Sequence, residues 1–205
     1  MNWVDFITNA AREHSWNDIP RIFYLFLRIA ESDYIGRYQL MHELNLTEAI
    51  IKTMLEKMRK AGIISAKLKK GHTLTDTGIQ LYTSFRDDVP IIRRNSFGDI
   101  TLFPQDVLFL IKNKSHKISN GMRQRDIAII TCRNIEVGVT TLTVKNREIL
   151  IPPNNIKVAE FYPEFYKKIR DLTFENNDVI IIGSSKNIVN AYLAGLSSVL
   201  DLFIN

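Results

Sequence analysis

Lysine and arginine side chains are concentrated in one short stretch of the chain. Between Lys52 and His72 there are seven Lys or Arg residues and a single acid, Glu56. Residues 1–88 as a whole hold 12 Lys or Arg against 11 Asp or Glu, so the excess positive charge is local. Cationic side chains gathered on one side of a nearly neutral domain are typical of a surface that binds the phosphates of a nucleic acid.

A helix is expected to carry the first half of these cations. Thr47 stands where an N-terminal cap belongs, and Gly62 stands where a left-handed C-terminal cap belongs. At about 100° per residue, one side of this helix is apolar and forms the predicted core face: Ile50, Ile51, Met54, Leu55 and Met58. The opposite ridge is predicted to be exposed and carries Ala49, Lys52, Thr53, Glu56 and Lys60.

A β-hairpin is expected to carry the second half. A strand over 62–70 is predicted to turn at Lys70-Gly71 and to return through His72. The two-residue alternation of a strand would place Lys67 and Lys69 on one side, with Lys70 and His72 beside the turn. These side chains would reach the phosphates that flank a groove occupied by the helix.

A solvated helix face is the alternative interpretation of the ridge. Glu48–Lys52 and Glu56–Lys60 are spaced four residues apart in the favourable order, and each such pair stabilises a helix by about 0.2–0.5 kcal/mol. Any soluble helix can carry such pairs. The basic hairpin that follows directly favours the nucleic-acid interpretation over this one.

Residues 18–86 resemble the winged helix-turn-helix family of transcription regulators. The resemblance rests on "YQLMHELNLTEAIIKTMLEKM", on "KAGII" and on the phrase Leu74-Thr75-x-x-Gly78. It implies that 47–60 is a recognition helix for the major groove and that 64–74 is the wing. The DNA contacts that it implies are Arg37, Gln39, Thr47, Lys52, Thr53, Lys60, Lys67, Lys69, Lys70 and His72. Members of this family also serve as protein–protein modules, so a scaffold role stays open.

The remaining N-terminal residues are predicted to form three further helices before the basic stretch. A short amphipathic helix over 2–15 carries Trp3, Val4, Phe6 and Ile7, which would either form a dimer interface or pack on their own domain. A second, largely apolar helix begins with Asn17 or Asp18 as its cap and Pro20 in its first turn. A third helix is expected over 37–44.

The segment "RDDVPIIRRNS" lacks any periodicity and is interpreted as a domain junction. It divides the chain into 1–88 and 89–205. In the second part we expect a strand at 98–103, the apolar segment "DVLFLIK", a helix after Gly121, a hairpin over 137–151, a helix from Pro163, a buried strand "DVIIIG" and a final helix. The predicted fold class is therefore α+β: a winged helix-turn-helix domain and a mixed α/β domain.

Two features of the second part could bind an anion. Gly183, Ser184 and Ser185 follow the buried strand and precede a helix, where backbone N–H groups can hold a phosphate. Arg123 and Arg125 lie near the start of another helix and suit a phosphate or a carboxylate. The alternative for Gly183, Ser184 and Ser185 is a tight strand-to-helix turn. The alternative for Arg123 and Arg125 is surface salt bridging. If both features met in one cleft, this domain would bind a small anionic effector.

No catalytic motif is recognisable, so we expect neither an enzyme nor a cofactor. The four histidines have no metal-binding spacing, and Cys132 lies in an apolar segment that favours burial. A small phosphotransferase or nucleotide-binding enzyme is the alternative, but Asp99 and Asp178 are expected at strand edges, where carboxylates are solvated. The segments "GMRQRDIAI" and "DVIIIGSSKNIVNAYLAGL" resemble uncharacterised archaeal winged-helix proteins with a C-terminal domain of unknown function.

These observations together predict a regulator that binds double-stranded DNA. With 45% hydrophobic and 24% charged residues the composition is that of a globular protein. There is neither an apolar run of about 20 residues that would span a membrane nor a secretory signal. The single cysteine cannot form an internal disulfide, and we expect a cytoplasmic protein. We also expect a homodimer whose C-terminal domain modulates DNA binding through a ligand or through self-association.

Overall fold

The computed structural model describes residues 2–13, 18–133 and 136–204. The chain divides into two compact units, Met1–Arg86 and Asp87–Asn205, whereas the sequence suggests a boundary between 88 and 89. Both units contain helices and antiparallel strands, and the predicted α+β class is confirmed. Among the described residues, none of the helices has both the length and the apolar character needed to cross a bilayer.

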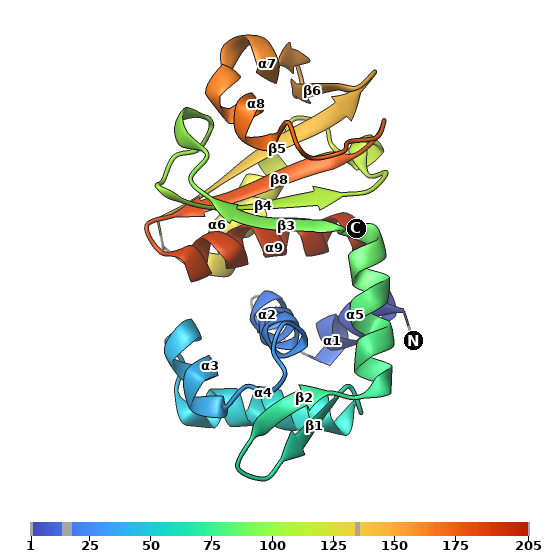
Figure 1. The fold of residues 1–205 in the computed structure, drawn as a ribbon, viewed down its shortest axis with the longest axis vertical. Helices are drawn as coiled ribbons and strands as arrows, with labels where there is room; N and C mark the ends of the chain where they lie inside the picture. Colours follow the sequence, from blue (N-terminus) through green and yellow to red (C-terminus); the bar gives the residue numbers. More distant parts are fainter. Residues whose placement is uncertain (1, 14–17, 134–135, 205) are drawn as a thin grey trace. The chain divides into compact units, whose positions relative to one another are not determined.

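The N-terminal unit consists of helices and one hairpin (Figure 1). Its elements are α1 (Trp3–Glu13), α2 (Ile19–Ala30), α3 (Arg37–Leu44), α4 (Glu48–Lys60), β1 (Ile64–Lys67), β2 (Gly71–Leu74) and α5 (Asp76–Asp88). Asp18 is the N-cap of α2 and a proline lies in its first turn, as the sequence predicts. Because α2 is apolar around most of its circumference, it is buried along nearly its whole length and forms the centre of the unit.

An aromatic cluster joins α1 to α2 and α5. The ring of Trp3 lies 5.2 Å from that of Phe85, and Phe23 lies 5.0 Å from Phe85, both edge to face. Trp3 and Ile7 are completely buried. Of the two alternatives for α1, Trp3 follows the second, because its ring packs on Phe23 and Phe85 of its own unit.

Thr75 and Gly78 fix the hairpin to the helices on either side of it. The Thr75 hydroxyl donates to the Gly62 carbonyl at 2.6 Å and accepts from the Gly78 N–H at 3.1 Å. A Cβ atom on Gly78 would collide with the carbonyl oxygen of Ile63. The Leu-Thr-x-x-Gly phrase therefore has a physical reason: it closes the end of the hairpin onto the start of α5.

The C-terminal unit is built on one antiparallel sheet in the order β3-β4-β8-β5-β6-β7. The strands are β3 (Ile91–Asn95), β4 (Gln105–Ile111), β5 (Val137–Lys145), β6 (Glu148–Ile151), β7 (Ile156–Lys157) and β8 (Val179–Ser185). Figure 1 shows α6 (Met122–Cys132) and α9 (Ile188–Ile204) on one face, with α7 (Val158–Phe161) and α8 (Pro163–Ile169) on the other. The central strands β4 and β8 are buried on both faces.

The segment after α5 differs from the prediction. Ile91–Asn95, interpreted as part of a junction, is strand β3, while 98–103 holds a short 3-10 turn at Gly98–Ile100 in place of a strand. β3 lies at the edge of the sheet, where it pairs with β4. Edge strands tolerate charged residues and need no apolar alternation. Because β3 contains the pair Arg93-Arg94, its sequence does not show the alternation that predicts a strand.

Candidate functional site

The exposed ridge of α4 carries most of the residues predicted for it. Lys52, Thr53, Glu56 and Lys60 are exposed, and the buried face consists of Ile51, Met54, Leu55 and Met58. Ile50 was predicted to lie in the core, but its side chain is 41% exposed. Ile50 lies at the edge of the apolar arc, where its side chain reaches solvent. The Thr53 hydroxyl donates to the Ala49 carbonyl at 2.9 Å, so its oxygen can still accept a bond.

The start of α3 lies next to the start of α4. Arg37 forms an ion pair with Glu48 at 3.1 Å, and its guanidinium lies 5.0 Å from the centre of the Tyr38 ring. Gln39 donates to Glu43 at 3.3 Å. Thr47 has the extended conformation of an N-cap, and its exposed hydroxyl makes no capping bond. Arg37 and Thr47 thus lie at the N-terminal end of the ridge.

The hairpin turn begins earlier and is one residue longer than the predicted Lys70-Gly71 turn, because residues 68–70 separate the two strands. β1 ends at Lys67, Lys70 N–H bonds to the Lys67 carbonyl at 3.0 Å, and Lys69 has a φ of 61°. Lys69 therefore belongs to the turn, and the prediction that it shares a strand face with Lys67 is wrong. The ammonium groups of Lys67 and Lys70 lie 5.8 and 5.4 Å from the centre of the Tyr34 ring. Tyr34 was missed in the sequence because it lies in the loop before α3.

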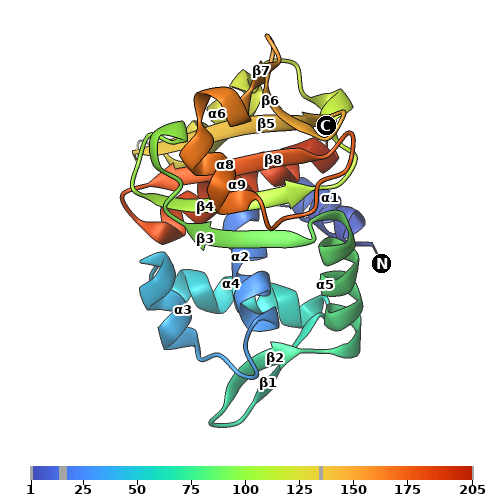
Figure 2. The same ribbon diagram turned by 45° about the horizontal axis from the view of Figure 1, so that its top comes forward.

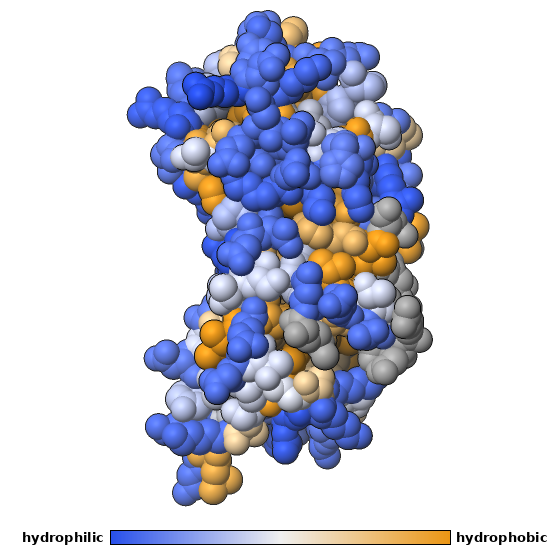
Figure 3. Space-filling view, turned by 90° about the vertical axis from the view of Figure 1, so that its right-hand side faces the viewer, coloured by the Kyte–Doolittle hydropathy of each residue, from blue (hydrophilic) through white to orange (hydrophobic). Residues whose placement is uncertain are grey.

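An apolar side chain accompanies the lysines at the tip of the hairpin. Leu68 is 89% exposed. Figure 3 shows a hydrophobic patch among hydrophilic side chains at the lower extremity of the N-terminal unit, where Figures 1 and 2 show the turn projecting beyond the helices. The tip is thus amphipathic.

His72 does not join the cationic group. Its backbone forms two hydrogen bonds with that of Ile35, which adds the loop before α3 to the edge of β2. The imidazole is half-buried, and its Nδ1 atom is buried without a partner among the described residues. Burial lowers the pKa of His72, and the nearby Arg59 and Arg37 lower it further. Both effects disfavour the protonated ring, so this geometry gives no support to the predicted phosphate contact of His72.

A groove separates the C-terminal end of α4 from β1. It has a volume of about 590 Å³ and is lined by Glu56, Arg59, Lys60, Ile64, Ser65 and Ala66. The ridge and the first hairpin strand therefore border one depression. Arg59 was not predicted as a contact, because it lies on the flank of the helix and not on the ridge opposite the core.

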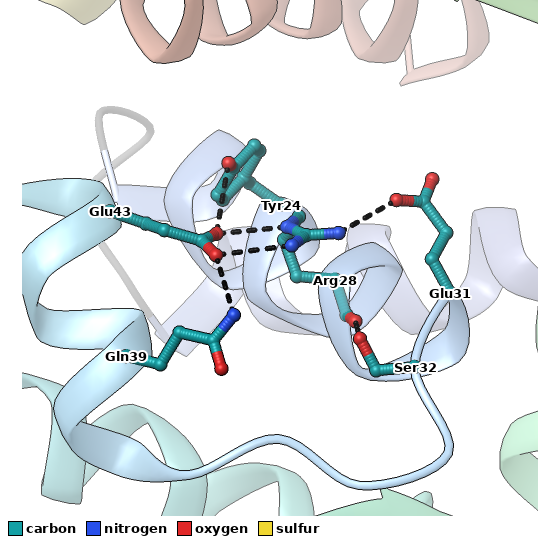
Figure 4. Close-up of polar contacts among 6 residues, drawn as sticks. All are labelled: Tyr24, Arg28, Glu31, Ser32, Gln39 and Glu43. Atoms are coloured by element: carbon teal, nitrogen blue, oxygen red, sulfur yellow. Dashed lines mark hydrogen bonds and ion pairs between the residues drawn. The ribbon is translucent and has the colours of Figure 1, made fainter.

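A hydrogen-bonded network joins α2 to α3, the helix that lies next to the N-terminal end of the ridge (Figure 4). Arg28 Nε and Nη2 donate to the two carboxylate oxygens of Glu43 at 2.8 and 3.1 Å. Tyr24 and Gln39 also donate to this carboxylate, each at 3.3 Å. Burial alone would raise the pKa of Glu43, but the hydrogen bonds and the charge of Arg28, helped by the bonds from Gln39 and Tyr24, outweigh it and lower this pKa.

We expect the Glu43→Gln variant to be less stable than the native protein by about 1–2 kcal/mol at pH 7, because Arg28 keeps its ion pair with Glu31 but loses the charge of Glu43. The lowered pKa means that the native carboxylate stabilises the fold above pH 4.5, its ordinary value, and that this stability is lost as the pH falls further. Urea unfolding measured between pH 3 and 7 should show that the free energy of unfolding falls less on acidification in the variant than in the native protein. Glu56→Gln is the control, since Glu56 is exposed and lies 3.9 Å from Lys52; equal losses in all three proteins would contradict the prediction.

Arg123 and Arg125, the two arginines predicted to bind an anion, both have carboxylate partners. Arg123 donates from Nε and Nη2 to both oxygens of Asp201, at 2.7 and 2.8 Å, and Asp201 is almost fully buried. Arg125 pairs with the adjacent Asp126 at 2.9 Å. Lys117 and Arg123 border a small pocket of about 210 Å³ with Gln124, Asp201 and Leu202. The salt-bridge alternative therefore accounts for both arginines.

Gly183, Ser184 and Ser185 do not form the predicted anion-binding turn. All three are buried within β8, and Asn187 caps α9 by accepting from Val189 N–H at 2.8 Å. A Cβ atom on Gly183 would collide with Ala191 and Gly195, so this glycine permits close packing of α9 on the sheet. Arg123 donates to Asp201, which lies near the C-terminal end of α9, about 20 Å along the helix axis from the end that follows Ser185. The two features do not meet in one cleft.

Two buried carboxylates stabilise loops of the sheet. Asp178, expected to be solvated, is 1% exposed and accepts from Asn113 and Glu175 N–H at 3.2 and 2.9 Å, with Lys112 at 3.2 Å. Asp106 accepts from Phe97 N–H at 2.7 Å, and its burial raises its pKa. Cys132 is buried, as predicted. No cluster of three or more His, Cys, Asp or Glu residues is arranged for a metal within residues 2–13, 18–133 and 136–204.

Known proteins resemble this chain in the sequence of its second half and in its fold. A family model described as a domain of unknown function (DUF4443) matches residues 104–202. A probable DNA-directed RNA polymerase of Podospora anserina is 24% identical over 93% of this chain, which spans only 22% of that protein.

Among solved structures, the hypothetical protein PH0730 from Pyrococcus horikoshii OT3 has a TM-score of 0.71 and 23% identity, and the match covers 92% of each chain. At this identity the likeness shows a shared fold. The domain match and this structure fit the resemblance to uncharacterised archaeal proteins.

Proposed function

We propose that this protein is a DNA-binding transcriptional regulator of the winged helix-turn-helix kind. The observation that carries the proposal is the groove shared by α4 and β1, because it brings the exposed ridge of the helix next to the lysine-bearing hairpin. In this proposal α4 is the recognition helix and β1–β2 is the wing. The name of the Podospora relative, a DNA-directed RNA polymerase, supports a role connected with nucleic acid.

The chemistry of the ridge suits a major groove, which is about 12 Å wide and admits one helix. Ala49 and Thr53 are small enough for close approach, and the Thr53 oxygen is free to accept a hydrogen bond from a base. Glu56 would accept from a cytosine amino group. Lys52 and Lys60 lie towards opposite ends of the ridge and would contact phosphates on the two sides of the groove.

The hairpin would supply affinity without reading sequence. Lys67, Lys69 and Lys70 are exposed, and the Tyr34 ring restrains two of them near one another. Arg37 would add a contact at the N-terminal end of the ridge by exchanging Glu48 for a phosphate. We propose that the C-terminal unit modulates this binding, through a small ligand or through self-association, and that it has no catalytic role.

One observation favours the alternative that this surface binds a protein. Ile50 is exposed at the edge of the apolar face, and a groove of about 370 Å³ beside it is lined largely by Ile22, Ala49, Ile50 and Met54. An apolar contact of this kind would suit a partner helix. Salt separates the two functions, because DNA binding through several cations releases counterions, whereas an apolar contact barely responds to salt.

We expect the native protein to enrich duplexes from a random DNA pool and to bind the selected duplex with a strong dependence on salt. Five phosphate contacts predict that affinity falls about 500-fold between 50 and 200 mM salt. Fluorescence anisotropy of a labelled duplex at several salt concentrations measures this slope. Failure to enrich any duplex, or an affinity independent of salt, would contradict DNA binding and favour the protein-binding function.

A further inference from the structure

The outward face of α6 exposes three large apolar side chains on one helix. Met122 is 50% exposed, Ile129 46% and Ile130 57%. The opposite side of the helix is buried against the unit through Gln124, Ala128, Thr131 and Cys132. The exposed side chains are therefore not needed for the packing of α6 within its own chain.

Two opposite charges lie within the same exposed face. Met122, Arg125, Asp126 and Ile129 follow the spacing i, i+3, i+4, i+7, which places them on one side of a helix. In the single chain Arg125 donates from Nε and Nη2 to the neighbouring Asp126 at 3.1 and 2.9 Å. Both side chains are about half exposed, so each can exchange this partner for another at little cost.

We infer that α6 is a dimer interface that pairs with α6 of a second copy, antiparallel across a two-fold axis. A two-fold interface must be complementary to itself, because the same patch contributes from both copies. If Arg125 faces Asp126 of the second copy, then Met122, three residues earlier, faces Ile129, three residues later. Both the charges and the apolar side chains therefore match in one register.

Charge selects this orientation over the parallel one. Two parallel helices in register would place Arg125 opposite Arg125 and Asp126 opposite Asp126, which is unfavourable for both pairs. The apolar side chains would supply most of the affinity, while the exposed charges would set the orientation. A single helix on each side makes a small interface, below about 1,200 Å², so we expect a weak and concentration-dependent dimer.

This inference concerns the C-terminal unit and stands whether or not the protein binds DNA. The sequence predicts a dimer interface on α1, but Trp3 and Ile7 of that helix are buried, whereas the outward face of α6 is exposed.

Sedimentation velocity of the full chain from about 1 to 200 μM tests the proposal, with variants Ile129→Asp and Asp126→Arg. We expect the native protein to dimerise and both variants to have a dissociation constant at least tenfold higher. The double variant Arg125→Asp, Asp126→Arg reverses both charges and keeps the match, so it should dimerise like the native protein. Leu102→Asp is the control, because Leu102 is an exposed apolar residue of the same unit that does not belong to α6 and lies beside Gly138 of β5.

The double charge exchange distinguishes this interface from a loss of folding, because a misfolded variant would not recover its dimer. A native protein that stays monomeric at 200 μM would overturn the inference. So would a dimer that Asp126→Arg leaves intact, or one that Arg125→Asp, Asp126→Arg fails to restore. Circular dichroism of each variant verifies that the helices are retained.

Discussion

Replacing Lys67, Lys69 and Lys70 with alanine is expected to weaken binding to duplex DNA about 100-fold at 0.15 M salt. Each of the three ammonium groups is exposed at the turn of the hairpin, where it would neutralise one phosphate. Loss of three such contacts should also flatten the plot of log affinity against log salt by about 2.7, which is 0.9 for each contact. Fluorescence anisotropy over a salt series gives both quantities in one experiment.

The control variant changes Lys145, Lys167 and Lys186 to alanine. These lysines are exposed on the C-terminal unit, so the variant loses the same formal charge without touching the hairpin. We expect its salt dependence to equal that of the native protein. If both triple variants lost affinity equally, net charge and not the wing would account for binding. Affinity unchanged by the hairpin substitutions would remove the wing from the proposed mechanism.

Gly183→Ala is expected to destabilise the C-terminal unit by about 3 kcal/mol or more. The added methyl group would overlap backbone atoms of Ala191 and Gly195, and backbone cannot move aside as the end of a flexible side chain can. The collision lies in the middle of the sheet, where β8 pairs with both β4 and β5. Relief would require α9 to move away from the strand it covers, and unfolding in urea followed by circular dichroism would measure the loss.

Gly36→Ala is the matched control for this substitution. No atom lies within 4 Å of a Cβ built on Gly36, and its φ of −82° suits any residue. We expect a change within about 0.5 kcal/mol for this variant. A Gly183→Ala protein as stable as Gly36→Ala would mean that α9 does not pack on β8 as closely as the structure shows.

The helices and the hairpin of the N-terminal unit could be predicted because their signals are local. Thr47 stands one residue before α4, Gly62 has the left-handed conformation expected of it, and Asp18 and Pro20 mark the start of α2. Each signal acts within one or two turns of the chain. The details of the turn were less predictable: three residues, Leu68–Lys70, separate the strands, and this places Lys69 outside both.

Features that depend on distant parts of the chain could not be predicted in this way. Gly183-Ser184-Ser185 has the composition of a turn, but β4 and β5 on either side hold it as a strand, and α9 requires its glycine. His72 lies at the end of a lysine-rich run and is nevertheless half-buried, because the backbone of Ile35 pairs with it. Asp178 is surrounded by N–H donors from two loops that the sequence does not bring together.

The position of β8 in the sheet has a consequence for synthesis of the chain on the ribosome. β8 separates β4 from β5, yet it is the last of these strands to be made. Until residue 185 has left the exit tunnel, β4 and β5 each expose an apolar edge that has no partner, and such nascent intermediates are prone to aggregate. β8 therefore joins the two parts of the sheet, and premature termination before Val179 would leave β3–β4 and β5–β6–β7 as two separate half-sheets.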